Sequence, residues 1–281
     1  MLRFGETIKI FLNKLRSFSR LTKLNRFVSP KDLWQLKRRK KYEPGQIKTK
    51  LGLIKYADAP TLLSGLEEIF IDEIYKVGKF SNQKPIVIDC GANIGLSAIY
   101  FSQKYDAEVY AFEADPSICE CLLKNTENIC PPLGKIRVIN KAIWINDNGV
   151  DFDIEGGYSG QIHQHGHNLV KYSVRLPSVS LRETISNFEH VDFLKVDIEG
   201  AENQAILDCE GVLNIIDYIF IEWHSISSDP QMLGEILNLL KKEGFRYHIK
   251  EAFAARSPFV EVEEICGMDL QLNIFAFKET R

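Results

Sequence analysis

The chain has 281 residues, of which 45% are hydrophobic, and its formal net charge is −3. This length and composition suit one large soluble α/β domain with appendages. Residues 1–41 contain thirteen Lys and Arg but only two acids, so the remaining residues carry about −14. Six cysteines without a C-x-x-C pair exclude a zinc ribbon and predict reduced thiols in a cytoplasmic protein.

The N-terminal segment predicts a basic amphipathic helix. Basic residues interrupt its apolar positions, so it fits neither a secretory signal nor a spanning helix. We expect it either to lie on an anionic membrane surface, which would place the protein on the inner membrane face, or to pack on the body or a second subunit. RRKKY at 38–42 adds charge, and a boundary follows, giving an arm at 1–43 and a main domain at 44–281. The apolar positions are Phe4, Ile8, Phe11, Leu15 and Phe18.

From about residue 60, helices and strands are expected to alternate. A helix over about 60–74 precedes strands at 86–90, 108–113, 136–140, 192–197, 218–223, 245–250 and 270–278. Helices are expected at 94–104, 116–128, 201–209 and 230–243. Such alternation predicts a doubly wound, mostly parallel sheet of seven strands. The last two runs lack a helix between them and should pair as an antiparallel ribbon. The alternation of helices and strands is interrupted at 144–180, where we expect a hairpin turn at Asn148-Gly149 and a flexible GGYSG loop.

The stretch VIDCGANIGLSAIY, residues 87–100, predicts a strand, a tight turn and a helix. Gly91 and Gly95 permit positive φ angles and a close approach of the backbone. A turn of this kind at the carboxyl edge of an α/β sheet is where nucleotides bind. Asp89 before the turn and Asn93 within it disfavour a pyrophosphate, whereas an acid attracts a sulfonium or ammonium group. The pattern favours S-adenosylmethionine over NAD.

The next strand ends in EVYAFEAD, and its Glu113 lies about twenty residues after the glycine turn. An acid at this place can hold the two hydroxyl groups of a ribose. Helix capping is the alternative role for both Asp89 and Glu113.

Three motifs, VIDCGANIGLSAIYFS, VYAFEADP and VDFLKVDIEGAE, resemble in order and spacing the FkbM family of S-adenosylmethionine-dependent methyltransferases. The resemblance covers about residues 60–280. It implies a Rossmann-like class I methyltransferase sheet with a reversed C-terminal hairpin, and O-methylation of sugar or polyketide hydroxyls. It also implies that Asp89, Gly91, Asn93 and Gly95 line the methionine and ribose part, that Glu113 holds the ribose, and that Ala142 lies near the adenine.

The strand FLKVDIEGAE ends in Asp197, and Glu199 follows two residues later. Carboxylates at this sheet edge face cofactor and acceptor. Asp197 and Glu199 are candidates for a general base toward an acceptor hydroxyl, or, with Glu222, for oxygen ligands of a divalent cation. Capping of the next helix is the alternative for Glu199. Lys195, one strand period before Asp197, should point the same way and pair with it.

The strand YIFIEWH ends in Glu222 and His224. A histidine has a pKa suited to accepting a proton near neutral pH, so His224 is a third catalytic candidate. His163, His165 and His167 alternate in the interruption, and they either share a face that binds a transition metal or are incidental to a mobile substrate loop.

Together these features predict an O-methyltransferase whose acceptor is a hydroxyl of a sugar or glycan, lipid-linked or close to a membrane. The alternatives are an NAD-dependent oxidoreductase and a non-catalytic protein that keeps the cofactor fold and docks by its basic arm. No nucleic-acid partner is expected. The sequence does not define the acceptor, the methylated position, the metal requirement or the oligomeric state.

Overall fold

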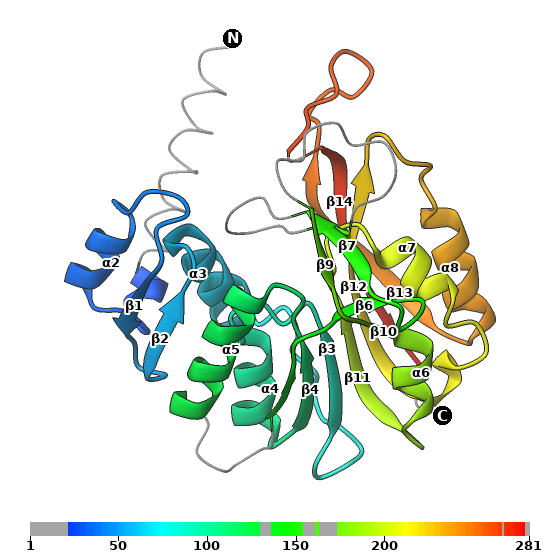
Figure 1. Cartoon of the computed structure of the whole chain (residues 1–281), viewed down its shortest axis with the longest axis horizontal. Coiled ribbons are helices and arrows are strands. Elements are labelled where there is room, and N and C mark those ends of the chain that lie inside the picture. Colours follow the sequence, from blue (N-terminus) through cyan, green and yellow to red (C-terminus); the bar gives the residue numbers. More distant parts are fainter. Residues whose placement is uncertain (1–21, 130–135, 154–160, 163–172, 266, 279–281) are drawn as a thin grey trace.

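The computed structural model describes residues 22–129, 136–153, 161–162, 173–265 and 267–278 (Figure 1). The predicted amphipathic helix before residue 22, the GGYSG loop at 156–160 and the three alternate histidines, His163, His165 and His167, lie outside these residues. Within the described residues, no helix is long and apolar enough to cross a membrane.

A seven-stranded sheet forms the centre of the molecule, in the order β13-β14-β12-β11-β3-β4-β5. All neighbouring strands are parallel except β14, which runs antiparallel to both β12 and β13. The predicted doubly wound sheet and its C-terminal antiparallel ribbon are therefore confirmed. The strands are β3 (Ile86–Cys90), β4 (Glu108–Phe112), β5 (Ile136–Ile139), β11 (Val191–Val196), β12 (Ile216–Ile226), β13 (Arg246–Ala254) and β14 (Met268–Phe277).

Side chains that alternate along these strands divide between two cores, one on each face of the sheet. In β3, Val87 belongs to one core and Ile88 to the other. Both faces are apolar because helices cover both (Figure 1). The helices α4 (Leu96–Tyr105) and α5 (Pro116–Ile129) contribute to the first core, and α6 (Leu181–Ser186), α7 (Glu202–Leu207) and α8 (Leu233–Lys242) to the second.

An N-terminal cap packs on the first core beside the carboxyl edge of the sheet. It consists of α2 (Pro30–Leu36), β1 (Gly45–Lys48), β2 (Leu53–Tyr56), α3 (Ala59–Gly65) and the π-helix η1 (Leu66–Ile71). Buried Asn125 of α5 ties the cap to the sheet, because its amide donates to the carbonyls of both Lys55 and Ile94. Leu33 and Leu36 of α2 are buried in this same core, so the described part of the basic arm packs on the body.

The interruption after β5 forms short strands beside the main sheet: β6 (Ala142–Trp144), β7 (Val150–Asp153), β8 (Gln161–Ile162), β9 (Ser173–Leu176) and β10 (Ser178–Ser180). Gly149 has φ +84, and the chain bends over residues 145–148 before β7 begins. The predicted hairpin is nevertheless wrong, because β6 pairs with β10 whereas β7 pairs with β8 and β9. The turn dipeptide defines a reversal of the chain but not the pairing of the strands around it.

Candidate active site

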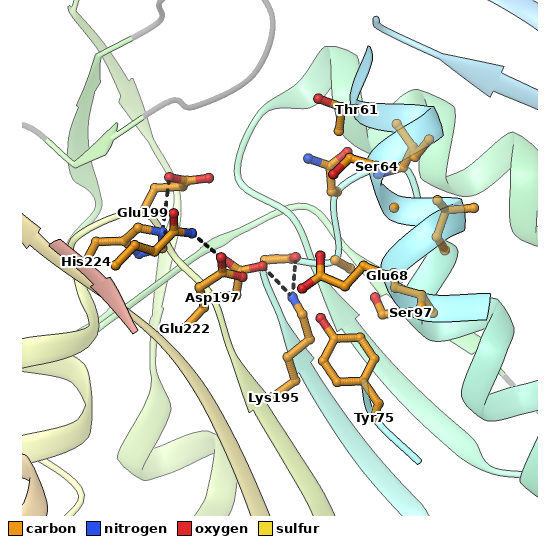
Figure 2. Close-up of a pocket in the computed structure, with 18 of the residues that line it drawn as sticks. Thr61, Ser64, Glu68, Tyr75, Ser97, Lys195, Asp197, Glu199, Glu222 and His224 are labelled. Carbon is orange, nitrogen blue, oxygen red and sulfur yellow. Dashed lines mark hydrogen bonds and ion pairs between the residues drawn. The ribbon is translucent and has the colours of Figure 1, made fainter. Parts of the chain in front are cut away.

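A cavity of about 340 Å³ opens where β3, β11 and β12 end. One wall comes from α3, η1 and the segment after them, the second from the turn after β3, and the third from β11, β12 and β14. Its polar and charged lining residues are Thr61, Ser64, Glu68, Tyr75, Asn93, Ser97, Lys195, Asp197, Glu199, Glu222, His224 and Gln271 (Figure 2). This is the carboxyl edge of the sheet, where the sequence placed the site.

The glycine turn is fixed by close backbone contacts. Gly91 has φ +78, and a Cβ atom on it would lie 1.7 Å from the Asp197 carbonyl oxygen. Gly95 has φ +92, and its Cβ atom would lie 2.5 Å from the Leu122 side chain. Asn93 also has a positive φ, +50, and its Oδ1 atom accepts the Ile94 N–H at 2.7 Å. Only glycine fits the first two positions, and the turn therefore lies directly against the end of β11.

Glu113 supports this turn from the end of β4. Its carboxylate accepts the N–H groups of Asn93 and Asp115, each at 2.9 Å. Burial raises the pKa of Glu113 to about 7, although the two backbone hydrogen bonds oppose that shift. The carboxylate keeps acceptor capacity beyond these two bonds, and it lies beside the cavity residue Asn93 rather than in the cavity wall itself.

Asp89 and Lys195 form a buried ion pair below the turn. Asp89 is fully buried, its Oδ2 accepts the Ser97 hydroxyl at 2.6 Å, and its Oδ1 lies 3.4 Å from Lys195 Nζ. Lys195 Nζ also lies 3.1 Å from Asp197 Oδ2 and donates to the Gly91 carbonyl at 2.8 Å. Burial alone lowers the pKa of Lys195, but Asp197 and Asp89 hold it well above its usual value. The predicted pairing of Lys195 with Asp197 is confirmed, and Asp89 does not line the cavity.

Asp197 and Glu199 face the cavity from the loop after β11. Their side chains are 23% and 31% exposed, so both can be reached by a bound molecule. Glu199 has φ +54, which turns it toward His224. Burial raises the pKa of Glu199 to about 7, and the neighbouring Asp197 acts in the same direction while the charge of His224 opposes it.

His224 is buried among acids at the end of β12. Its Nδ1 atom lies 3.1 Å from Glu202 Oε1, and its Nε2 atom lies 3.7 Å from Glu199 Oε2. Burial by itself lowers the pKa of His224, but Glu202, Glu199 and Asp197 raise it to about 10. The imidazolium form therefore dominates near neutral pH. The proton-accepting role of this histidine stays a prediction, and the surrounding acids favour its protonated form.

Glu222 and Glu68 complete the set of acids. The Gln271 amide donates to Glu222, and burial followed by the charge of Asp197 raises the pKa of Glu222 well above its usual value. Burial and Asp197 likewise raise the pKa of Glu68. Thus the cavity is lined by carboxyl groups that lie close enough to disfavour simultaneous ionisation.

The wall of the cavity formed by α3 and η1, the helical wall, was not predicted from the sequence to be part of the site. Thr61, Ser64 and Glu68 follow at spacings of three and four residues and face the cavity (Figure 2). Tyr75, which packs edge-on against Phe220, closes the base of this wall. The predicted helix over 60–74 contained these residues, but a polar stripe on a helix does not reveal what it faces.

Ala142, expected near the adenine, is buried in β6, and its N–H donates to the Pro177 carbonyl. It does not line the cavity.

Asp197, Glu199 and His224 have ligand atoms within 4.8 Å of one another, whereas Glu222 does not join this group. Lys195 and the His224 imidazolium already supply positive charge to these acids. The divalent-cation site therefore stays a prediction for Asp197 and Glu199, and Glu222 lies outside the group.

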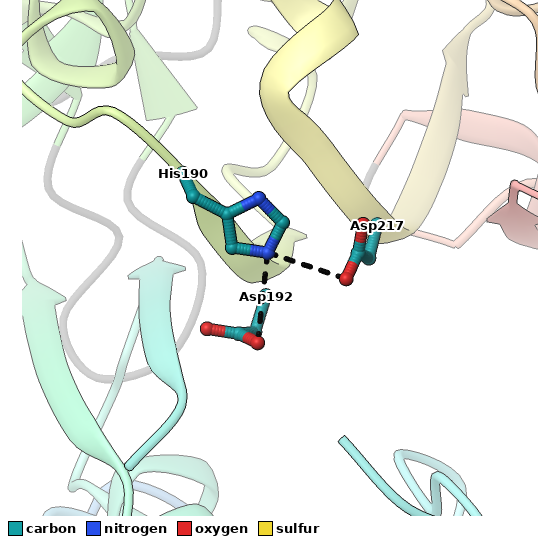
Figure 3. A group of neighbouring side chains, drawn as sticks. All are labelled: His190, Asp192 and Asp217. Atoms are coloured by element: carbon teal, nitrogen blue, oxygen red, sulfur yellow. Dashed lines mark ion pairs between the residues drawn. The ribbon is translucent and has the colours of Figure 1, made fainter. Parts of the chain in front are cut away.

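A second group of neighbouring ionisable side chains lies at the start of β11 and β12, away from the cavity (Figure 3). His190 Nε2 lies 3.2 Å from Asp217 Oδ2 and 3.6 Å from Asp192 Oδ1. Asp192 is fully buried and accepts hydrogen bonds from the Asn82 amide and the Ile86 N–H. These bonds give Asp192 a structural role at the amino edge of the sheet.

Comparison with known proteins identifies the family. The model of the "Methyltransferase FkbM domain" matches residues 89–247, more than half of the chain. The chain belongs to the FkbM methyltransferase family. It is an S-adenosylmethionine-dependent methyltransferase, as the three sequence motifs predicted, and the NAD-dependent alternative is set aside. The strand order and the reversed last strand are those of a Rossmann-like class I methyltransferase sheet.

Three relatives are named as methyltransferases. Methyltransferase sdnD of Sordaria araneosa is 26% identical over 64% of this chain and 80% of its own length. The 2-O-methyltransferase NoeI of Sinorhizobium fredii is 28% identical over 56% of this chain and 71% of its own length. The hexuronic acid methyltransferase AglP of Haloferax volcanii is 24% identical over 57% of this chain and 64% of its own length.

Proposed function

We propose that this FkbM methyltransferase methylates a hydroxyl group of a sugar or glycan, with Glu199 as the general base. The observation that carries the proposal is the Glu199 carboxyl group, which lines the cavity, is partly exposed and has a pKa of about 7. A base is most effective when its pKa lies near the working pH. One relative is named a 2-O-methyltransferase, which supports an oxygen as the methylated atom, and another a hexuronic acid methyltransferase, which supports a sugar as the acceptor.

The residues around the turn after β3 fit S-adenosylmethionine. A Cβ atom on Gly91 or Gly95 would collide with Asp197 or Leu122, so glycine at both positions lets the turn pack directly against the end of β11 and against α5. Glu113 has carboxylate lone pairs left for the hydroxyl groups of a ribose. Asp197 presents a carboxylate toward a cationic group, and Asp89 acts indirectly by holding Lys195.

The bound cofactor supplies an electrophilic methyl group attached to a positively charged sulfur. The acceptor oxygen forms the new bond to that methyl carbon as the bond from carbon to sulfur breaks, and the electron pair stays on the sulfur. The proton of the acceptor hydroxyl passes to the Glu199 carboxylate. His224 remains protonated, and its charge stabilises the ionised form of Glu199 before the transfer.

The test uses Glu199→Gln and a panel of methyl glycosides, with product detected by mass spectrometry. We expect kcat to fall about 100-fold or more, as for removal of a general base. Binding of S-adenosylhomocysteine, measured by calorimetry, should change less than threefold. Glu251→Gln, an exposed position on β13, is the matched control. An unchanged kcat in Glu199→Gln would overturn the assignment of Glu199 as the general base. Absence of methyl transfer to every glycoside of the panel would overturn the assignment of a sugar as the acceptor.

We further propose that the basic arm docks on an anionic membrane surface, which would bring the cavity to a membrane-proximal glycan. In its described part, Trp34 is 60% exposed and the Arg38 guanidinium lies 4.3 Å from the centre of its ring. Lys40 and Lys41 follow and are exposed. An aromatic ring beside clustered Lys and Arg is typical of a protein surface that meets lipid headgroups.

This docking can be tested without disturbing the core. Leu33 and Leu36 are buried, so deletion of the arm would expose apolar surface of the body. Trp34→Ser combined with Lys40→Glu and Lys41→Glu alters only exposed side chains. We expect this variant to lose most of its sedimentation with vesicles that contain phosphatidylserine. Sedimentation equal to that of the wild type would overturn the docking proposal.

A further inference from the structure

Acidic side chains outnumber basic side chains in the lining of the cavity. Among the described residues, two bases, Lys195 and His224, face four carboxyl groups, and no arginine is present in the wall. Arginine is the side chain that usually recognises a carboxylate or phosphate group, through two parallel hydrogen bonds. The four carboxyl groups belong to Glu68, Asp197, Glu199 and Glu222.

Both bases are already engaged by acids of the protein. Lys195 contacts Asp197 and Asp89, and its side chain is only 3% exposed. The two ring nitrogens of His224 face Glu202 and Glu199, and its side chain is only 2% exposed. An anionic group of an acceptor placed beside these residues would therefore find no base available to pair with it, and it would meet carboxyl groups instead.

Glu68 differs from the other three acids because no hydrogen bond or ion pair engages it within the described part of the chain. Asp197 pairs with Lys195, Glu199 lies beside His224, and Glu222 accepts the Gln271 amide. Figure 2 shows the Glu68 carboxyl group directed from the helical wall toward Asp197 and Lys195. A half-buried acid without a partner, aimed into a cavity, is available to a ligand.

The position of Glu68 on the wall indicates which ligand it meets. It lies in the π-helix η1, and such helices are frequent at functional sites. Thr61 and Ser64 face the cavity from the preceding turns. This wall stands across from Asp197 and lies outside residues 89–247, the segment that matches the family. Two hydroxyl groups and a carboxylate can hydrogen-bond the hydroxyl or ammonium groups of a sugar ring.

We infer that the sugar ring entering this cavity is neutral or carries an ammonium group, and is neither a uronate nor a sugar phosphate, with Glu68 as the residue that sets this preference. The inference rests on the proposed methylation of a sugar hydroxyl and names its acceptor class. Glu68 repels an anionic acceptor because like charges at short distance inside a partly buried site are weakly screened. It attracts an ammonium group and accepts hydrogen bonds from a neutral ring.

The experiment compares three acceptors of similar size that differ in one group: a methyl glucoside, a methyl glucuronide and a methyl glucosaminide. We expect kcat/KM for the glucuronide to be at least tenfold lower than for the other two at pH 7.5. Glu68→Gln should reduce this discrimination at least fivefold, while Glu251→Gln leaves it unchanged. Binding of S-adenosylhomocysteine to Glu68→Gln should stay within threefold of the wild-type value, which separates an acceptor role from a cofactor role.

Three results would overturn the inference. The first is a wild-type kcat/KM for the glucuronide that equals the value for the glucoside. The second is equal discrimination in the wild type and Glu68→Gln. The third is a loss of S-adenosylhomocysteine binding in Glu68→Gln without a change in discrimination, which would assign Glu68 to the cofactor. Failure of all three glycosides, with S-adenosylhomocysteine still bound, would instead overturn the sugar acceptor in the proposed function.

Discussion

The two sides of the cavity are built in different ways. On the cofactor side, the turn after β3 is held by backbone contacts, by Glu113 and by the Lys195 ion pairs. On the helical side, Thr61, Ser64 and Glu68 reach the cavity from a wall outside the segment that matches the family. The first side is therefore held together by contacts within the protein, whereas the second leaves side chains available to a ligand.

Removal of the central cation should have the largest effect, and it should damage the cofactor side. Lys195→Met leaves the buried carboxylate of Asp89 and the partly exposed carboxylate of Asp197 without their counter-charge. Breaking such a pair costs about 3–5 kcal/mol, so the free energy of unfolding in urea should fall by that amount at pH 7.5. Lys79→Met, at an exposed position, is the control.

The pH dependence sharpens this prediction. In the wild type the pKa of Lys195 is raised, so its contribution persists through neutral pH and is lost only as the pH rises past the raised value. In Lys195→Met the loss should be smaller at pH 5 than at pH 8, because a protonated carboxyl group carries no charge to bury. An equal loss at both values would mean that packing of the lysine stem, and not its charge, supports the turn.

A methyl group at Gly91 should have the next largest effect. Gly91→Ala places a Cβ atom 1.7 Å from the Asp197 carbonyl oxygen at a residue with φ +78. Overpacking and backbone strain together cost roughly 2–4 kcal/mol, and the turn should move away from β11. We expect binding of S-adenosylhomocysteine to weaken at least 30-fold by calorimetry. Gly78→Ala, where a Cβ atom meets nothing within 4 Å, should bind normally; a similar loss there would point to general destabilisation.

The cofactor side was predictable from sequence because its parts are local. Gly91, Glu113 and Asp197 each stand directly after a strand, and a parallel sheet brings such positions to one edge. The charge of His224 could not be predicted in this way. It depends on Glu202, which is the first residue of the helix α7 after β11 and resembles an ordinary first-turn acid in the sequence.

The acceptor side could not be predicted, for a related reason. Glu68 belongs to a helix that the sequence did indicate, but its contact with the cavity depends on how the cap packs against the sheet. That packing is fixed by distant contacts such as those of Asn125 with Lys55 and Ile94. Likewise the pairing of β7 with β9 depends on residues far from the turn at Gly149.

A smaller effect is expected from Glu113, through the pH dependence of cofactor binding. Its pKa of about 7 means that the carboxylate, the form that accepts ribose hydroxyls, becomes more populated as the pH rises from 6 to 8. S-adenosylhomocysteine should therefore bind about tenfold more tightly at pH 8 than at pH 6. Glu113→Gln should bind weakly at both values, and Glu120→Gln, exposed on α5, should keep the wild-type dependence. A dependence retained by Glu113→Gln would assign the titration to another acid of the site.

The smallest effect is expected on the helical side, where loss of one hydroxyl leaves the fold intact. Thr61→Val removes a hydroxyl but keeps the side-chain shape, and the Thr61 N–H still donates to Asp58, which caps α3. One hydrogen bond is worth about 0.5–1.5 kcal/mol, so KM for a neutral glycoside should rise roughly two- to tenfold while kcat and stability change little. Ser81→Ala, at an exposed position, is the control. A fall in kcat at constant KM would place Thr61 at the reacting centre, and would mean that the helical wall takes part in the chemistry as well as in recognition.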